Sequence, residues 1–388
     1  RFVIGEKQMK NMARHIVTGT LTLLVLWAAS CSHDTEVFGT SDKEPILSIG
    51  LRLPARSPEP GEGYEAGETY ENYIDIENNN YRIYFFTSDN KLIARFEPDG
   101  FVETQGSDYR DYSMLGKAPT ALADHQSFKM VVLANWPQYG DDTMKAGETL
   151  LADICNAAWG RFDSFSAFEL GPERLIPFYG VREYDNIAFK SGEAALLPEP
   201  VTLLRAVAKA EVILKTDDHF DLSFSEVKIR RYNNKGYCAP KDVFSQDDYD
   251  HGGEWNSDYV SGLHLVDNSN DAEEKIQNFR FAYQWIGADG NKYEKWIAYL
   301  PEYRNIDAGD KYSCIEVRLD IQAGKDEYHK VYFANYDENG KTDNNDDAKR
   351  FDISRNNLYR FTVTVRDNRL TVNVQEWQYA YDNEYTFD

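Results

Sequence analysis

The chain has 388 residues, a formal net charge of −23 and an apolar fraction of 42%. Its length is comfortable for two domains, and its apolar content excludes an intrinsically disordered protein. The negative charge argues against binding to nucleic acids or to anionic membrane surfaces, because like charges repel. Tyr and Phe supply most of the aromatic residues, which favours β-strands.

The first 31 residues are predicted to be a targeting segment. An apolar stretch over residues 16–27 is too short to span a bilayer and follows a basic start formed by Lys10, Arg14 and His15. The next residues, Ala28-Ala-Ser-Cys31, are similar to a lipobox, in which the cysteine receives a diacylglycerol and becomes the mature N-terminus. Met9 or Met12 is the expected start of translation.

Residues 32–44 are polar and are predicted to be a tether between the lipid and the folded part of the chain. No later segment is apolar enough to span a bilayer. We therefore expect a protein that is anchored to a membrane through Cys31 rather than inserted into it.

The first strand of the mature chain is expected within residues 45–56. Apolar side chains alternate there with Ser48, Gly50 and Arg52, which gives one apolar face formed by Leu47, Ile49, Leu51 and Leu53. Pro54 ends the strand, and Arg56 stands before a linker rich in Pro and Gly. Two interpretations stay open: an ordinary first strand of a β-sandwich, or a strand that is released by cleavage after an arginine and then replaced.

The first half continues as a mostly β domain over residues 57–200. A hairpin is predicted over residues 81–96, and a strand buried on both faces over residues 128–137, with Asn135 as a turn former. Residues 149–159 have the spacing of a short amphipathic helix, and residues 175–180 an irregular apolar segment. The Leu197-Pro-Glu-Pro200 sequence marks a domain boundary.

The second half, residues 201–388, is predicted to be another β-sandwich. Its first segment, residues 201–214, favours a strand over a helix because of its Val and Ile residues, and further strands are expected at 220–230, 295–301, 314–321, 330–335 and 359–374. The last strands form a hairpin. After it, the apolar parity changes, which predicts a bulge or a crossing near Gln375. The final segment carries its own aromatic stripe, formed by Trp377, Tyr379, Tyr381, Tyr385 and Phe387, which could pack on its own domain or on a neighbour.

The sequence contains no recognisable catalytic motif, and we expect no enzyme activity, no cofactor and no metal site. Acidic loops at residues 247–254 and 336–347 are interpreted as solvated loops, since the second departs from an EF-hand in its glycine and in its twelfth position. Three cysteines remain after lipidation, an odd number that gives no disulfide framework: Cys155, which we expect in the core, Cys238 and Cys314. The tryptophans are assigned to the core or to interfaces rather than to sugar stacking.

Several of these stretches together resemble the fimbrillin family, the subunits of type V pili in Bacteroidales. Besides the lipobox and the early strand followed by arginine, the similar stretches are Val131-Val-Leu-Ala-Asn135, Ile176-Pro-Phe-Tyr-Gly180, Leu204-Arg-Ala-Val-Ala-Lys209 and Arg355-Asn-Asn-Leu-Tyr359. Their order extends over about 350 residues. Phe178 stands where the family usually has methionine, and Ala28 where a lipobox usually has leucine.

The resemblance implies two transthyretin-like β-sandwich domains and a route of assembly on the cell outer membrane. The subunit is exported as a lipoprotein, an arginine-specific protease cuts it, the first strand leaves, and a strand of another fimbrial subunit fills the groove. In this sequence, Cys31 would be lipidated, Arg56 would be the cleavage site with Arg52 as second choice, and residues 377–388 would donate the strand. Host or bacterial surface ligands would be further partners.

Other roles remain open from the sequence. Stalk, tip and anchor subunits share the fold, and an anchor would keep its first strand. The alternative from another class is a surface lipoprotein that binds glycans or host proteins without polymerising.

Overall fold

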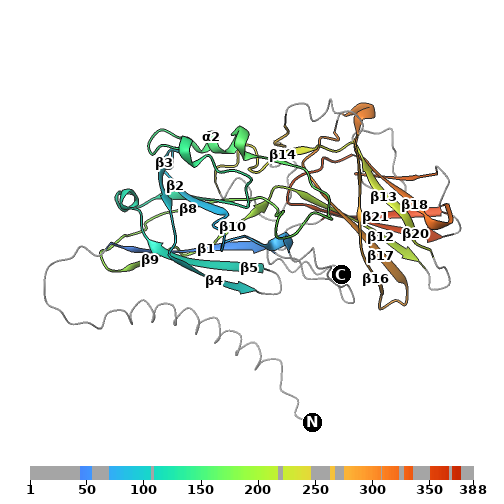
Figure 1. The fold of residues 1–388 in the computed structure, drawn as a ribbon, viewed down its shortest axis with the longest axis horizontal. Helices are drawn as coiled ribbons and strands as arrows, with labels where there is room; N and C mark the ends of the chain where they lie inside the picture. The colour runs from blue at the N-terminus through green and yellow to red at the C-terminus, as the bar shows by residue number, and fades with distance from the viewer. Residues whose placement is uncertain are drawn as a thin grey trace, which may run out of the picture. The chain divides into compact units, whose positions relative to one another are not determined.

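The computed structural model describes residues 44–54, 70–105, 109–216, 222–245, 263–266, 275–306, 308–322, 327–334, 350–366 and 369–376 (Figure 1). The chain divides into two units, residues 1–43 and 44–388, and all described residues belong to the second. The described part is predominantly β-structure, so the predicted all-β class is confirmed.

Two five-stranded sheets are built from the described chain up to Arg205. Sheet I has the order β10-β1-β5-β4, with β9 also beside β1, and consists of β1 (Ile46–Pro54), β4 (Gly100–Gln105), β5 (Tyr109–Lys117), β9 (Ala194–Leu196) and β10 (Val201–Thr202). Sheet II has the order β11-β8-β6-β2-β3 and consists of β2 (Tyr81–Phe86), β3 (Leu92–Phe96), β6 (Phe128–Ala134), β8 (Phe178–Tyr184) and β11 (Leu204–Arg205). Apolar residues of both sheets form one buried cluster, so the two sheets enclose a common core.

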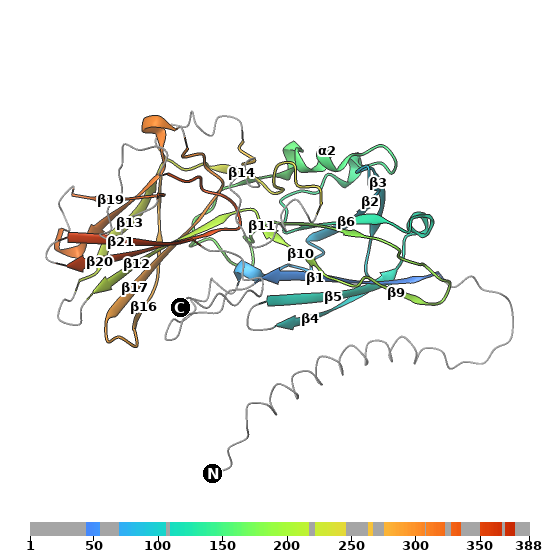
Figure 2. The ribbon, with the colours of Figure 1, turned by 180° about the vertical axis from the view of Figure 1, so that it is seen from behind.

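Two further sheets follow from Ala208 onwards and share a second core (Figure 2). Sheet III has the order β16-β17-β12-β20-β21 and consists of β12 (Ala208–Thr216), β16 (Arg280–Ile286), β17 (Lys292–Leu300), β20 (Leu358–Arg366) and β21 (Arg369–Glu376). Sheet IV has the order β15-β13-β18-β19 and consists of β13 (Phe224–Arg230), β15 (Ile276–Asn278), β18 (Cys314–Leu319) and β19 (His329–Tyr332). A small ladder joins β7 (Arg161–Asp163) to β14 (Lys235–Tyr237).

Helical structure among the described residues is short. It comprises one α-helix, α2 (Leu151–Cys155), the 3₁₀ turns η2 (Thr120–Asp124), η3 (Asp141–Thr143), η4 (Ala158–Gly160), η5 (Gly309–Lys311) and η6 (Asp320–Gln322), and 3₁₀ structure at residues 70–72. The helix expected over residues 149–159 is therefore present only in its first part. The Asn156 side chain donates a hydrogen bond to the carbonyl of Ala152 at 2.8 Å, which satisfies a terminal helix acceptor and ends the helix.

Several sequence predictions are confirmed. Strands β2 and β3 form the expected hairpin, and every residue of β6 is buried. Asn135, at the end of β6, has a φ of 57°, and its side-chain amide donates hydrogen bonds to the carbonyls of Tyr73 and Ile176. A short polar side chain tolerates this left-handed conformation and here also joins three segments.

The prediction of an irregular segment over residues 175–180 is wrong for residues 178–180. Phe178 to Gly180 open β8, which lies in the interior of sheet II between β11 and β6. A Cβ atom on Gly180 would lie 2.5 Å from Leu203 Cδ2 and 2.8 Å from the carbonyl oxygen of Thr202. The glycine is therefore needed because the chain passes close over this strand.

The end of the described chain is more regular than expected. β20 and β21 form the predicted hairpin, and their register continues without a shift to the pair of Tyr359 and Glu376. The described residues therefore contain no bulge near Gln375, and the aromatic segment from Trp377 onwards lies outside them. β11, which ends at Arg205, is the last strand of sheets I and II, and β12, which begins at Ala208, is the first strand of sheets III and IV. The division into two domains at residue 200 stays a prediction.

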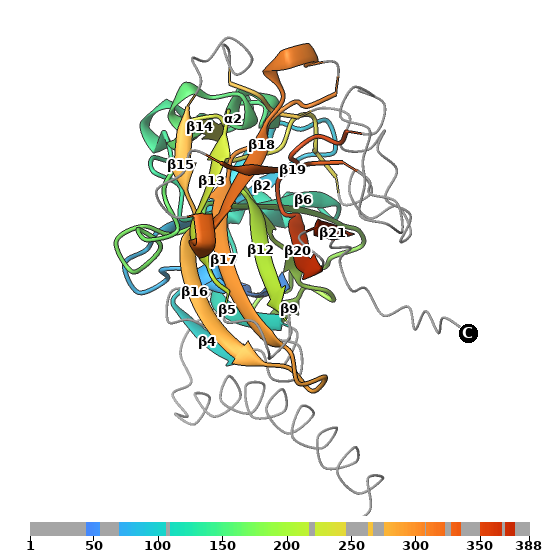
Figure 3. The ribbon, with the colours of Figure 1, turned by 90° about the vertical axis from the view of Figure 1, so that its right-hand side faces the viewer.

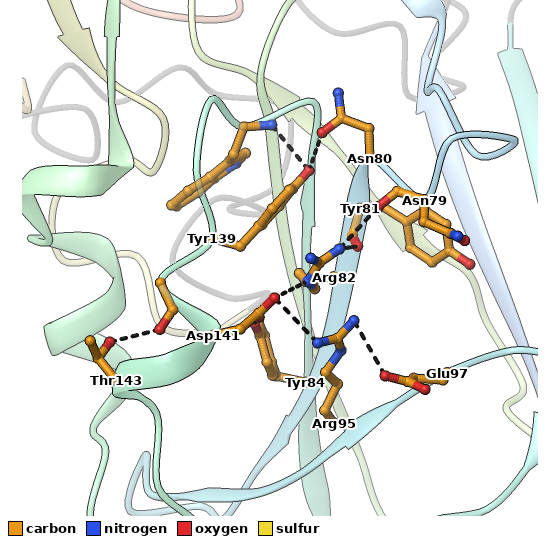
Figure 4. A network of polar contacts seen from close by, with 12 residues as sticks. Asn79, Asn80, Tyr81, Arg82, Tyr84, Arg95, Glu97, Tyr139, Asp141 and Thr143 are labelled. Atoms are coloured by element: carbon orange, nitrogen blue, oxygen red, sulfur yellow. Dashed lines mark hydrogen bonds and ion pairs between the residues drawn. The ribbon is translucent and has the colours of Figure 1, made fainter.

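A polar network fastens the β2–β3 edge of sheet II to the turn η3 (Figure 4). Asp141 accepts hydrogen bonds from Tyr84 Oη at 2.7 Å and Arg82 Nε at 2.8 Å, and its Oδ2 lies 3.3 Å from Arg95 Nη1. Burial alone would raise the pKa of Asp141, but the hydrogen bonds from Tyr84 and Arg82 and the nearby arginine charges lower it overall. Ionised Asp141 thus stabilises this edge of the fold.

Replacing Asp141 with asparagine should therefore destabilise the protein in a pH-dependent way. At pH 7 we expect Asp141→Asn to lower the free energy of unfolding by about 1.5–3 kcal/mol, the usual contribution of hydrogen bonds to a charged group. Because the pKa of Asp141 is lowered on folding, its stabilising effect is present above the unfolded value of about 4 and is lost as pH falls through the folded value. Urea unfolding at several pH values should show the difference from wild type shrinking in acid, whereas a constant difference would contradict this role.

Candidate functional site: the first strand and its neighbours

Strand β1 is an interior strand of sheet I, with ladders along both of its edges (Figure 1). On one side, nine residue pairs join it in antiparallel register to β5, from Ile46 opposite Lys117 to Pro54 opposite Tyr109. On the other side it runs parallel to β9 and then to β10. A strand in this position satisfies its backbone donors and acceptors on both edges, which an edge strand does not do.

The apolar face predicted for this strand is confirmed. Leu47, Leu51 and Leu53 are 0% exposed and Ile49 is 2% exposed, and all four belong to the core between sheets I and II. The alternate residues Ser48, Gly50 and Arg52 are only partly buried. Burying four aliphatic side chains contributes roughly 1.5–3 kcal/mol each, so this row is a large part of what holds the strand in place.

Strand β5, which forms the longest ladder with β1, was not predicted from the sequence. Only Tyr112, Met114 and Gly116 of β5 are buried, and charged residues stand on both sides of this set, so the apolar alternation is short. A weak signal for β5 is the alternation of Tyr112 and Met114, which follows a turn-forming sequence. β5 pairs with the preceding strand, β4, over six residues.

Along its parallel edge, β1 pairs with two short strands, β9 and β10. The Leu197-Pro-Glu-Pro200 sequence, which predicted a domain boundary, lies between these two strands. Backbone hydrogen bonds continue across this gap, because the Leu197 amide donates to Ser48 and the Leu203 amide donates to Arg52. Pro200 passes directly over Gly50, where an added Cβ atom would lie 3.1 Å from the proline Cβ atom. Gly50 therefore allows the segment between β9 and β10 to lie flat on the first strand.

The two candidate cleavage sites differ in their surroundings. Arg52 lies inside the β1 ladder, and its guanidinium donates hydrogen bonds to both carboxylate oxygens of Asp111, at 2.8 and 2.7 Å, while packing over the ring of Tyr109. Cleavage at Arg52 would require this ladder to open. Arg56 lies outside the described residues, as do the lipidation candidate Cys31 and the donor candidates Trp377, Tyr379, Tyr381, Tyr385 and Phe387.

The described residues offer little to bind a metal or to perform chemistry. Within them, no group of three or more His, Cys, Asp or Glu side chains is arranged to hold a metal ion. Cys155, Cys238 and Cys314 are free and buried, and burial raises the pKa of Cys155 to about 12 and that of Cys314 to about 11, so neither thiol is activated at neutral pH. No helix in the described ranges is long and apolar enough to cross a membrane.

Comparison with solved structures finds fimbrial and cell adhesion proteins of Bacteroidales. The tip fimbrial protein Mfa3 of Porphyromonas gingivalis has 13% identity and a TM-score of 0.40, over 85% of this chain and 99% of that chain. A proposed cell adhesion protein of Bacteroides eggerthii has 16% identity and a TM-score of 0.41, over 88% and 98% of the two chains. The fimbrial anchor protein Mfa2 of P. gingivalis has 11% identity and a TM-score of 0.29, over 86% and 96%.

No family model matches the sequence, and the search of curated proteins found no match.

The burial pattern of β1 predicts which of its side chains retain the strand. Leu51→Ala should lower the free energy of unfolding by about 2–5 kcal/mol, because it removes fully buried methyl groups from the core. The matched variant Ser48→Ala, on the outer face of the same strand, should change it by less than about 0.5 kcal/mol. Urea unfolding of the uncut protein measures both values, and equal losses for the two variants would contradict the assignment of the faces.

Proposed function

We propose that the protein is a structural subunit, stalk or tip, of a cell-surface fimbria, exported as a lipoprotein through Cys31 and assembled by strand exchange. The observation that carries the proposal is the position of β1. This strand lies in the interior of sheet I, yet it is joined to the later described strands through a single connection, the linker after Pro54.

A single cut in that linker would turn β1 from a covalent part of the fold into a bound peptide. Among residues 53–69, Arg56 is the only Lys or Arg, so an arginine-specific protease has one site there. The arginine inside the strand, Arg52, is held by Asp111 and by the β5 ladder. These features make Arg56 the proposed cleavage site and Arg52 the second choice.

Loss of β1 would leave a groove in which another strand could bind. The edges of β5, β9 and β10 would lose their hydrogen-bond partners, and the core would lose the side chains of Leu47, Ile49, Leu51 and Leu53. An incoming strand with an alternating apolar face satisfies both deficits, as in other cases of strand addition. The gain from burying such a row again is the driving force that we propose for polymerisation.

The proposed donor is the aromatic segment that follows β21, at the edge of sheet III. Its large side chains at alternate positions, Trp377, Tyr379, Tyr381, Tyr385 and Phe387, have the period of two that one face of a groove requires. A contact in which the end of one copy fills the groove of the next is head-to-tail and does not close on itself. It therefore generates a filament.

This proposal assigns the protein to the outer surface of the cell, with other fimbrial subunits and an arginine-specific protease as partners and with adhesion as the purpose of the fibre. The competing role is that of an anchor, or of a surface lipoprotein that binds a glycan or a host protein. Both would keep β1 in place, so retention or release of this strand separates the two roles.

Limited digestion with trypsin tests the proposed maturation. We expect a first cut after Arg56, a stable core beginning at Ser57, and release of the β1 peptide accompanied by ladders on a non-boiled gel. Arg56→Ala should abolish both the cut and the ladders, whereas the matched variant Arg52→Ala should leave them intact. N-terminal sequencing of the core and the gel pattern provide the measurements.

Two outcomes would count against the proposal. A first cut that is lost in Arg52→Ala but kept in Arg56→Ala would move the processing site into the strand. A core that is cut after Arg56 but keeps the β1 peptide and stays monomeric would remove the stalk role and favour an anchor or a binding protein.

A further inference from the structure

The outer face of β1 makes two contacts that its apolar row does not explain. Gly50 and Arg52 face away from the core, since they alternate with the buried residues Ile49 and Leu51. Arg52 lies opposite Asp111 of β5, and Gly50 lies beneath the segment between β9 and β10. Any strand that replaces β1 in this groove would meet the same two surroundings, two positions apart on its outer face.

The position of Gly50 has no room for a large side chain. An added Cβ atom there would lie 3.1 Å from Pro200 Cβ and 3.3 Å from Pro200 Cα. These contacts are already tight for a single Cβ atom, and a longer or branched side chain would have to displace the backbone of Pro200. This position therefore suits glycine, tolerates alanine and excludes larger residues.

Side chains of β8 hold Pro200 and its neighbour in place. Arg182 Nη1 donates a hydrogen bond to the Pro200 carbonyl at 3.2 Å, and the same guanidinium forms an ion pair with Glu199. Tyr184 Oη donates a hydrogen bond to the Glu199 carbonyl at 2.7 Å. None of these contacts involves β1, so they can keep Pro200 in position after β1 leaves.

The position of Arg52 suits a planar cation. Its guanidinium donates through Nε and Nη2 to the two carboxylate oxygens of Asp111, and its Cζ lies 4.7 Å from the centre of the Tyr109 ring. Arginine makes such a bidentate and stacked contact, whereas lysine presents a compact point charge. The Arg52 side chain is 42% exposed, so the attraction is modest. A carboxylate in this place, however, would lie directly across from Asp111 and be repelled.

Asp111 and Tyr109 do not depend on β1 for their place in the sheet. Both belong to β5, which pairs with β4 over six residues along its other edge (Figure 3). Arg110, between them in the chain, forms an ion pair with Glu103 of β4 at 3.2 Å. Departure of β1 would thus take the Arg52 cation away from Asp111 and leave the carboxylate on the edge of the groove.

We propose that this groove selects an incoming strand by its outer face as well as by its apolar row. The preferred strand carries glycine or alanine beneath Pro200 and, two positions later in the direction of β1, arginine opposite Asp111. The partner is thus a strand of a fimbrial subunit that has a small residue and a cation at this spacing. The inference rests on the proposed function, because it describes the strand that follows β1 in the same groove.

The sequence of this chain's own proposed donor meets only the first requirement. Its outer positions, between the aromatic residues, include Ala380 and then Asp382, and residues 377–388 contain no Lys or Arg. With Ala380 beneath Pro200, Asp382 would lie opposite Asp111, and like charges directly across a ladder are destabilising. We therefore expect the groove to bind the tail of a second copy more weakly than the tail of a different subunit that carries a cation here.

Peptide exchange into the trypsin-cut protein tests the selection directly. The cut protein is mixed with an excess of isotopically labelled peptides of residues 45–56, and their incorporation is followed by native mass spectrometry. We expect the Gly50→Val peptide and the Arg52→Asp peptide to bind roughly tenfold more weakly than the wild-type peptide. The matched peptides Gly50→Ala and Ser48→Asp, altered on the same face, should stay within about threefold of wild type.

A variant of the protein identifies the source of the charge preference. In Asp111→Asn protein, the difference between the wild-type and Arg52→Asp peptides should fall to about threefold or less, because the carboxylate that repels is gone. The penalty on the Gly50→Val peptide should persist in this variant. Equal incorporation of all peptides into wild-type protein would overturn the selection.

The uncut protein provides a test of the charged pair that needs no exchange. Arg52→Asp should lower the urea midpoint of unfolding, and adding Asp111→Arg should restore most of the loss, because the reversed pair attracts again. The control that combines Ser48→Asp with Asp111→Arg should show no such recovery. A loss in Arg52→Asp that Asp111→Arg does not restore would contradict the role of Asp111.

The full chain tests the expectation for its own tail. Asp382→Arg should increase the ladders on a non-boiled gel about threefold or more at low salt, since attraction to Asp111 replaces repulsion. Asp388→Arg makes the same change of charge beyond the end of the β1 ladder and should leave the pattern unchanged. Equal ladders in both variants would remove the charge preference from self-assembly.

These results separate the selection from the proposed function. Exchange of the wild-type peptide with no discrimination among the variants would keep strand exchange and remove the selection. If even the wild-type peptide fails to enter the cut protein, strand exchange falls, and the charged pair is left as a determinant of β1 retention alone.

Discussion

The fold of the first half depends on one strand being paired along both edges. β1 contributes the buried row from Leu47 to Leu53, and it is the link between the long β4–β5 hairpin and the short strands β9 and β10. Without it, sheet I would separate into three pieces that share no ladder: the β4–β5 pair, β9 and β10. The strand that is joined to the rest through a single connection is thus also the strand on which this sheet depends.

The interior position of β1 explains how retention of the strand and its proposed release can depend on different residues. Retention comes from the apolar row and from the two ladders, which need no covalent link to act. Under the proposed function, release would depend on a cut in the chain beyond Pro54, which would leave these contacts intact but make departure of the strand possible. The polar neighbours of Arg52 keep the inner arginine within the ladder, so the two properties are assigned to different residues.

Much of this arrangement could be predicted from periodicity. Periodicity predicts the alternation in β1, the continuous apolar run of β6 and the β20–β21 hairpin, because the side chains of these strands face a core on one or both sides. The periodicity of β5 is a weak signal, because its alternation of Tyr112 and Met114 is short and stands between charged residues. β8 begins in a segment whose proline and glycine do not indicate a strand. The partners of a strand are set by tertiary pairing, and local pattern says little about them.

The groove around β1 also has a built-in direction. β1 is antiparallel to β5 over nine pairs and parallel to β9 and β10 over three and two pairs. Parallel pairing is slightly less stable per residue, so the present orientation places the better pairing on the longer ladder. A strand that bound in the opposite direction would be parallel to β5 and antiparallel to β9 and β10, so the weaker pairing would lie along the longer ladder. The sheet therefore favours one polarity in any strand that occupies this place, and a chain of such contacts would inherit that polarity from one copy to the next.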